Sequence, residues 1–234
     1  MSEIITSSDY IVVNGVSSDT VGLYIDTPPV PPMAQQRYTD YQTGSDMDGC
    51  TPDDAFENIR LTITAYQFFP DNFDNRAVYD FLKNPKTLQI SRFDDYYFKV
   101  QKLSGIQPES KSNGKRIKYT ITFDCKPFKY AVENPLEEIQ KGTSQNNGNR
   151  YSRPVWVISG SGECILWVNG ESLKITDVDG DVCVDCEKMI AYTESQIITQ
   201  NTTGKFPFLA SGDNAVDWNE NITAVYLQKN ERWY

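Results

Sequence analysis

The segment "TDVDGDVCVDC", residues 176–186, combines two residue patterns that can bind metal ions or exchange electrons. Three carboxylates stand at every second position, as calcium ligands often do: Asp177, Asp179 and Asp181. Cys183 and Cys186 follow in the C-x-x-C spacing of zinc sites and redox enzymes. Which chemistry is available depends on the elements that carry these side chains.

The calcium pattern is incomplete. An EF-hand loop that starts at Asp177 requires Gly at position 6 and Glu at position 12. This chain has Gly180 at position 4 and Lys188 at position 12. Because Asp-Gly is a frequent two-residue hairpin turn, the sequence predicts that Asp179-Gly180 forms the tip of a hairpin between strands 172–178 and 181–187.

The cysteine pattern is also unsuited to metal or redox chemistry. Redox motifs place the first Cys at a helix N-terminus, where the helix dipole lowers its pKa. Residues 182–186 instead alternate like a strand, in which side chains three apart point to opposite faces. Cys183 and Cys186 are therefore not expected to bind one ion. The chain contains no His, which excludes His-based triads and imidazole zinc sites.

The sequence also lacks the common catalytic and phosphate-binding motifs. The motifs G-x-S-x-G, G-x-x-x-x-G-K-[ST] and H-E-x-x-H are absent from the sequence. The Gly-rich segment 159–163 precedes a strand pattern rather than a helix, so no phosphate site is expected there. Four tryptophans could form a sugar-stacking platform, although core packing is their commoner role: Trp156, Trp167, Trp218 and Trp233. We predict no catalytic residue, no cofactor and no metal site.

Composition and charge narrow the class of protein. The chain has 234 residues, of which 39% are hydrophobic and 23% charged, enough for one large or two small cores. A net charge of −10 argues against specific binding of nucleic acid, which requires a basic face. No segment has the roughly 18–20 apolar residues of a membrane helix. The start "MSEIITSSDY" does not resemble a signal peptide, so we expect free thiols in a reducing cytoplasm.

The first half of the chain favours strands and one helix. Strands are predicted within 10–25, 58–69, 87–93, 96–106 and 115–125, the last preceded by an Asn113-Gly114 turn. Residues 27–32 predict a stiff proline connector, and residues 44–54 predict a loop. Apolar residues recur at helical spacing in 71–84: Phe73, Ala77, Val78, Phe81 and Leu82. Asp71 or Asn72 is expected to cap this helix, and Pro85 to end it.

The second half favours a different architecture. Residues 131–150 are polar and rich in Gly and Asn, which predicts a linker between two domains. The rest consists of short strand patterns separated by turns such as Asn169-Gly170, typical of an all-β sandwich. The sequence therefore predicts a mainly β protein, with one helix in a domain at 1–130 and a sandwich at 151–234.

Several segments resemble the distal tail proteins of long-tailed siphophages. The most specific is the pattern F-x-C-x-P-F-K-Y, from Phe123 to Tyr130. The resemblance extends over nearly the whole chain through "VNGVSSDTVGLYIDTPPVPP" (13–32), "NIRLTITAYQFF" (58–69), "DFLKNPKTLQISRFDDYYFKV" (80–100), "NGNRYSRPVWVISGSGECILWVNG" (147–170), "GKFPFLASGDNAVDW" (204–218) and the terminal "ERWY".

This resemblance implies a structural hub rather than an enzyme. Members of the family form a homo-hexameric ring at the virion tail tip, with N-terminal domains around a channel and galectin-like C-terminal sandwiches outside. The ring joins the tail tube protein to the tail-associated protein, and receptor-binding or other baseplate proteins dock around it. DNA passes through the channel without specific binding, which an acidic chain suits. Two alternatives remain: a carbohydrate-binding module for the host cell wall, and a wall hydrolase.

Overall fold

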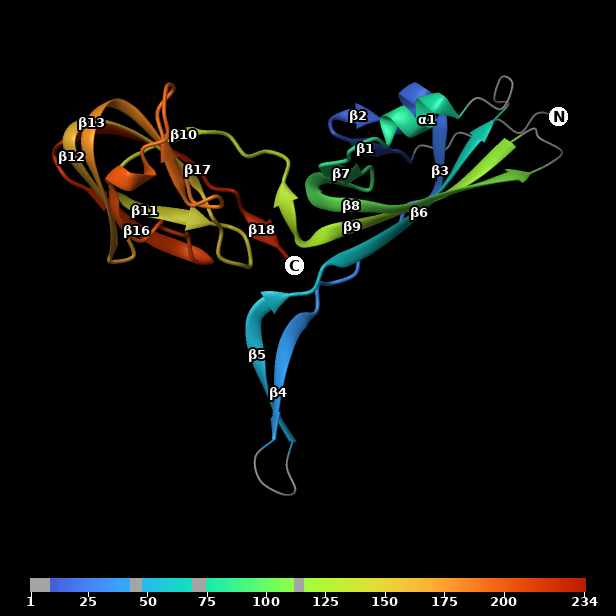
Figure 1. Cartoon of the computed structure of the whole chain (residues 1–234), viewed down its shortest axis with the longest axis horizontal. Helices are drawn as coiled ribbons and strands as arrows, with labels where there is room; N and C mark the ends of the chain where they lie inside the picture. The colour runs from blue at the N-terminus through green and yellow to red at the C-terminus, as the bar shows by residue number, and fades with distance from the viewer. Residues whose placement is uncertain (1–8, 43–47, 69–74, 112–115) are drawn as a thin grey trace. The chain divides into compact units, whose positions relative to one another are not determined.

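The computed structural model describes the backbone of residues 9–42, 48–68, 75–111 and 116–234. The chain divides into two compact units, Met1–Val132 together with Tyr234, and Glu133–Trp233. Strands dominate both units (Figure 1), and the one α-helix among the described residues belongs to the first. The predicted class, mainly β with a helix in the N-terminal part, is confirmed.

The first unit is built on one antiparallel sheet, whose strands run in the order β2-β1-β7-β8-β9-β6-β3, while β4 and β5 form a separate two-stranded sheet. Its elements are β1 (Ile11–Val13), β2 (Val16–Ser17), the 3₁₀ helix η1 (Ser18–Val21), β3 (Leu23–Thr27), β4 (Gln36–Gln42), β5 (Asp48–Phe56), β6 (Ile59–Phe68), α1 (Arg76–Phe81), β7 (Thr87–Ile90), β8 (Phe93–Lys111) and β9 (Arg116–Ala131).

One face of this sheet carries the first core. Strand β6 alternates as predicted, with Ile59, Leu61, Ile63 and Ala65 buried and the residues between them more exposed. Helix α1 covers the same face of the sheet (Figure 1). Val78 of the helix and Leu82, the residue after it, are fully buried in the first core. The helix is confirmed but short. The predicted caps Asp71 and Asn72, the apolar Phe73 and the Asn113-Gly114 turn lie outside the described residues.

The prediction of a loop over 44–54 is wrong from residue 48 onward. Residues Asp48–Phe56 form β5, which pairs with β4 in an antiparallel hairpin. The Gly, Pro and Asp residues of this segment suggested a loop. Pro52 is nevertheless compatible with β5, because each strand of a two-stranded sheet has one unpaired edge. The predicted proline connector 27–32 is confirmed from residue 28 onward, because Thr27 still belongs to β3 and residues 28–35 form no strand.

The second unit contains β10 (Glu137–Ile139), β11 (Gly142–Asn146), β12 (Val155–Val168), β13 (Glu171–Asp185), β14 (Ile190–Tyr192), the 3₁₀ helix η3 (Thr199–Asn201), β15 (Thr202–Gly204), β16 (Gly212–Trp218), β17 (Ile222–Gln228) and β18 (Arg232–Trp233). Its centre is the long hairpin of β12 and β13. Asn169 and Gly170 make the predicted turn, with φ angles of 52° and 83° that fit a type I′ turn.

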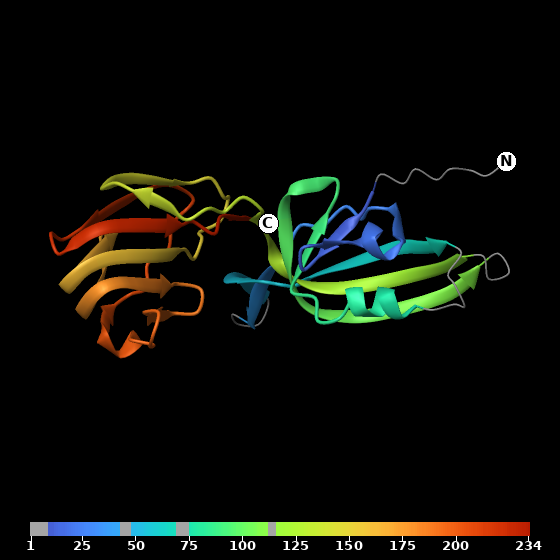
Figure 2. The same cartoon turned by 90° about the horizontal axis from the view of Figure 1, so that it is seen from above.

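The strands of the second unit form two layers, and the β12–β13 hairpin contributes strands to both of them. The first half of β12 pairs with β17, and its last residues pair with β16. Likewise β13 pairs with β15 through its first half and with β14 near its end. Figure 2 shows the strands of this unit from above. Buried side chains from both halves of the hairpin fill the core between the layers, among them Trp156, Ile158, Leu166, Leu173 and Val184.

The predicted linker 131–150 needs correction. Within it, β10 pairs with β17 and β11 pairs with β16, so both strands belong to the second unit. The polar residues of this segment suggested a linker, but one of them, Asn146, satisfies buried backbone groups. The buried Asn146 amide donates to the carbonyl oxygens of Arg150, Leu209 and Ala210 at 3.1–3.2 Å. The second unit therefore starts near Glu133, about 18 residues before the predicted domain start at 151.

Candidate functional site

The predicted hairpin tip at Asp179-Gly180 is wrong. Both residues lie inside β13, where they pair with Ser161 and Gly160 of β12. The β12–β13 register shifts between Gly162 and Cys164, and the φ angle of Gly180 is 96°. The Asp-Gly pair therefore lies where the continuous strand β13 bends from one layer to the other. The three aspartates are exposed there, and Asp181 accepts a hydrogen bond from the Ser159 hydroxyl at 2.5 Å.

The C-x-x-C cysteines are free thiols. Cys183 is half-buried on β13, and Cys186 is buried just beyond the end of that strand. Burial raises the pKa of Cys186 to about 12, and that of Cys125 to about 12 as well. A redox or metal-binding thiol needs a lowered pKa, so this environment favours the protonated, unreactive form. Within the described ranges, no group of three or more Cys, Asp or Glu side chains is placed to hold a metal ion.

Alkylation of the native protein tests this description of the thiols. Cys50 is exposed on β5, whereas Cys125, Cys164 and Cys186 are buried. A pKa of about 12 leaves roughly one thiol in ten thousand ionised at pH 8. Mass spectrometry after brief iodoacetamide treatment should find Cys50 modified and these three unmodified, and all five should react in urea. Rapid modification of Cys186 in the native state would contradict its assigned burial.

The outer face of the first sheet carries a charged cluster around Asp124. The Asp124 carboxylate accepts a hydrogen bond from Ser104 and forms ion pairs with Arg60 Nε at 2.9 Å and Lys102 Nζ at 3.4 Å. The Ser104 hydrogen bond and then Arg60 lower the pKa of Asp124 to about 2. The cluster joins β6, β8 and β9, so it fixes the outer side chains of three neighbouring strands.

Acid titration should reveal this cluster. Because the folded pKa of Asp124 lies below its ordinary value of 3.8, its contribution is complete above that pH and is lost as pH falls toward about 2. Asp124→Asn should lower the free energy of unfolding of the first unit by roughly 1–2 kcal/mol at pH 6, a discounted value because Arg60 and Lys102 are exposed. Urea denaturation at pH 6 and pH 2 should show this difference shrinking. Asp26→Asn, at an exposed position on β3, serves as control.

The charge of the chain is distributed unevenly along the sequence. Residues 58–132 contain 13 basic and 7 acidic residues, although the whole chain carries −10. On the outer face of the first sheet, Arg60 and Lys102 outnumber the single carboxylate of Asp124 that they share. This part of the first unit is therefore basic, although the whole chain is acidic.

The β4–β5 hairpin has the opposite character. Residues 36–57 contain one basic residue, Arg37, and six acidic residues: Asp40, Asp46, Asp48, Asp53, Asp54 and Glu57. None of the described side chains of either strand is buried. Among these carboxylates the structure describes Asp40 as exposed, Asp53 as half-buried and, just after β5, Glu57 as exposed. The described part of the hairpin is therefore acidic and open to solvent, which the sequence did not indicate because it predicts a loop for the second strand.

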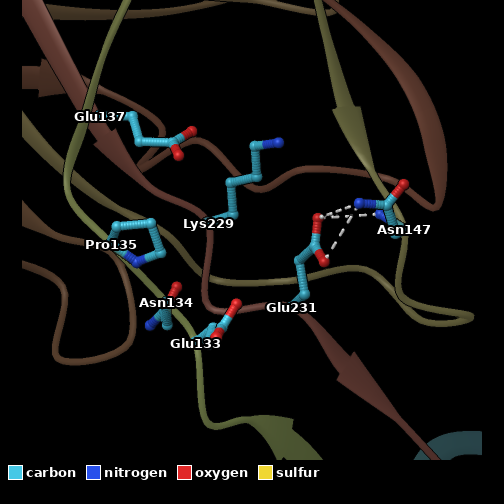
Figure 3. A pocket seen from close by; sticks show the side chains of 7 residues that line it. All are labelled: Glu133, Asn134, Pro135, Glu137, Asn147, Lys229 and Glu231. Carbon is cyan, nitrogen blue, oxygen red and sulfur yellow. Dashed lines mark hydrogen bonds between the residues drawn. The ribbon is translucent and has the colours of Figure 1, made fainter. Parts of the chain in front are cut away.

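A small hollow in the second unit gathers three glutamates around Lys229: Glu133, Glu137 and Glu231 (Figure 3). Its volume is about 120 Å³. Glu231 is already held by the backbone and side-chain amides of Asn147, at 3.0 and 3.1 Å. Asn134 accepts a hydrogen bond from Gln228 and thereby ties the start of the unit to its end. These contacts give the hollow a structural role.

The tryptophans do not form one platform. Trp156 and Trp218 are buried in the second core, which confirms core packing for these two. Trp167 points to the other side of β12, between the buried Leu166 and Val168. It lines a shallow hollow with the ion pair of Lys141 and Asp217, whose charged atoms lie 3.0 Å apart. Trp167 and Trp233 are both partly exposed, and Trp167 is the one that lines this hollow.

No protein-family model and no curated protein matches this chain. Solved structures do match it, and the fold is that of a phage adsorption-apparatus hub protein. One matching crystal structure is SPP1 Dit (gp 19.1), described as a paradigm of the hub adsorption apparatus in phages that infect Gram-positive bacteria. The TM-score is 0.72, with 15% sequence identity over 97% of this chain and 99% of that chain. The resemblance to distal tail proteins is confirmed at the level of the fold. The described part of the chain contains no helix long and apolar enough to cross a membrane.

Proposed function

We propose that this protein is the hub of a siphophage tail tip. The observation that carries the proposal is the fold shared with SPP1 Dit, which extends over both units rather than over one common domain. The role is structural, and the protein is not an enzyme. Its buried, protonated thiols and its hydrogen-bonded carboxylates agree with this, because these side chains stabilise the fold.

The hub acts as a homo-hexameric ring. A ring requires two different surfaces on each copy that fit each other, because head-to-tail contacts close only through such heterologous interfaces. The first unit has two such surfaces. One is the acidic β4–β5 hairpin, where none of the side chains that the structure describes is buried. The other is the outer face of the sheet, where Arg60 and Lys102 surround Asp124. Residues 1–132 are therefore the ring-forming part.

The second unit, from Glu133, is a galectin-like sandwich on the outside of the ring. The ring connects the tail tube protein to the tail-associated protein, and receptor-binding or other baseplate proteins dock around it. It is located at the tail tip of the virion. DNA passes through the channel without a sequence-specific contact. The strand-rich surfaces of both units support these roles, since they provide rigid faces for several neighbours.

Light scattering of the purified protein tests the ring. The expected mass is near six times the 26.6 kDa of the chain, and it should be reached as the protein concentration rises. A species that stays at 26.6 kDa at every concentration would contradict the proposal.

A carbohydrate-binding module is the second candidate function. The hollow beside Trp167 favours it, because an aromatic ring next to an Asp–Lys pair can stack on a sugar and bond its hydroxyls. This function predicts a monomer that is retained on isolated host cell walls and loses retention in Trp167→Ala. A ring-sized particle with no affinity for cell walls excludes it.

A further inference from the structure

Residues 28–34, which we term the proline strap, present two apolar side chains to solvent. Four prolines restrict the backbone: Pro28, Pro29, Pro31 and Pro32. Pro28 and Ala34 are buried at its two ends, whereas Val30 is 83% exposed and Met33 is 68% exposed. These are the largest exposed fractions of any large apolar side chain that the structure describes. A segment that is fixed at both ends and exposed in its middle loses little entropy when it binds a partner.

The outer face of the first sheet carries three aromatic side chains, Tyr24, Tyr66 and Phe68, which we term the aromatic patch. The ring of Phe68 lies 5.7 Å from that of Tyr24 and 6.2 Å from that of Tyr66. Tyr24 and Tyr66 are opposite each other on β3 and β6 and adjoin the buried Leu23 and Ala65, so they face away from the first core. The guanidinium of Arg116 lies 5.3 Å from the centre of the Tyr66 ring.

The strap of one copy runs away from its own aromatic patch. It leaves the sheet after Thr27, which pairs with Thr64 of β6. It rejoins the sheet where the Glu57 amide donates to the Gln35 carbonyl, just before β6 begins. The patch lies on the other side of Thr64, toward the end of β6. The strap and the patch thus lie toward opposite ends of β6. A head-to-tail contact between copies requires two different surfaces arranged in this way.

Charge complementarity favours a second copy as the occupant. The strap continues directly into the acidic β4–β5 hairpin, which has six acidic residues against Arg37 between residues 36 and 57. The patch is bordered by two basic side chains on β9, Arg116 beside Tyr66 and Lys118 opposite Tyr66, with one carboxylate, Glu109 of β8, opposite Lys118. When the strap of one copy approaches the patch of another, its acidic continuation therefore approaches a basic surface.

We propose that the proline strap of one copy docks on the aromatic patch of the next copy, with Val30 and Met33 as the inserted side chains. Proline-rich segments bind aromatic surfaces because their extended backbone is already formed and their side chains pack on the rings. The proposal rests on the proposed ring and adds the contact that closes it. Prolines also lack the N–H needed to extend a sheet, so this contact depends on side chains rather than on strand pairing.

Photo-crosslinking tests the contact in the full-length protein. Val30→p-benzoylphenylalanine should give covalent dimers and larger ladders under illumination, and mass spectrometry should find the link in the tryptic peptide 61–76, which contains Tyr66 and Phe68. The same group at Ile197, which is 63% exposed in the second unit, is the matched control and should not link to that peptide.

A second variant separates this inference from the proposed ring. Combined Val30→Ser and Met33→Ser should raise the concentration at which half of the ring dissociates by about tenfold or more, while Ile197→Ser should not. Higher salt should also weaken the wild-type ring. Rings that withstand the double substitution and give no link to 61–76 overturn the strap contact but leave the hub. A wild-type chain that remains monomeric and gives no crosslink overturns both.

Discussion

Replacing Trp156 with alanine is expected to lower the free energy of unfolding of the second unit by about 3–5 kcal/mol. Trp156 is fully buried on β12 and pairs with Val184 of β13 and Leu227 of β17. It is the largest of the fully buried side chains, so alanine would leave a large cavity between the layers. Urea denaturation, with hydrogen exchange of the β12 and β13 amides to localise the loss, measures the effect.

Trp167→Ala is the matched control, because Trp167 lies on the same strand but on the face away from the core. Its replacement should cost less than about 1 kcal/mol, as is usual for side chains outside the core. Equal losses for the two variants would mean that β12 does not have one buried and one accessible face, and the sandwich assignment would be wrong.

Gly204→Ala should be nearly as damaging, with an expected loss of about 3 kcal/mol. The φ angle of Gly204 is +105°, and an added Cβ would lie 2.2 Å from the Ser172 carbonyl oxygen. Gly204 pairs with Leu173, so relief of this clash would separate β15 from β13. Thermal or urea unfolding measures the loss, and exchange of the β15 amides should increase most.

Gly170→Ala isolates the contribution of the clash. Gly170 also has a positive φ angle, +83°, but no atom lies within 4 Å of its added Cβ. It should therefore cost only about 1 kcal/mol, from backbone strain alone. If the two alanine variants were equally stable, the close approach of β15 to β13 would not exist in solution.

Side-chain alternation made much of the fold predictable. Strand β6 and the Asn169-Gly170 turn follow directly from local pattern and turn chemistry. The local rules failed where a residue served a longer-range purpose. Gly180 bends one continuous strand instead of ending it, and Asn146 satisfies buried carbonyls instead of marking a linker. Neither purpose can be recognised until the partner strands are known.

The interaction surfaces were less predictable than the fold. Arg60 and Asp124 are 64 residues apart, and only the pairing of β6 with β9 brings them together. The net charge of −10 gave no indication of separate charged surfaces, yet the acidic hairpin and the basic side chains Arg60 and Lys102 belong to the same unit. A net charge contains no information about faces, so this separation required the structure.

Electron microscopy of the purified full-length protein at high concentration tests the central claim most directly, because it reports symmetry and closure together. We expect class averages of one closed particle with six-fold symmetry and a central channel, in which the first units surround the channel. Isolated monomers at every concentration, or filaments that do not close, would contradict the account of this protein as a ring-forming tail hub.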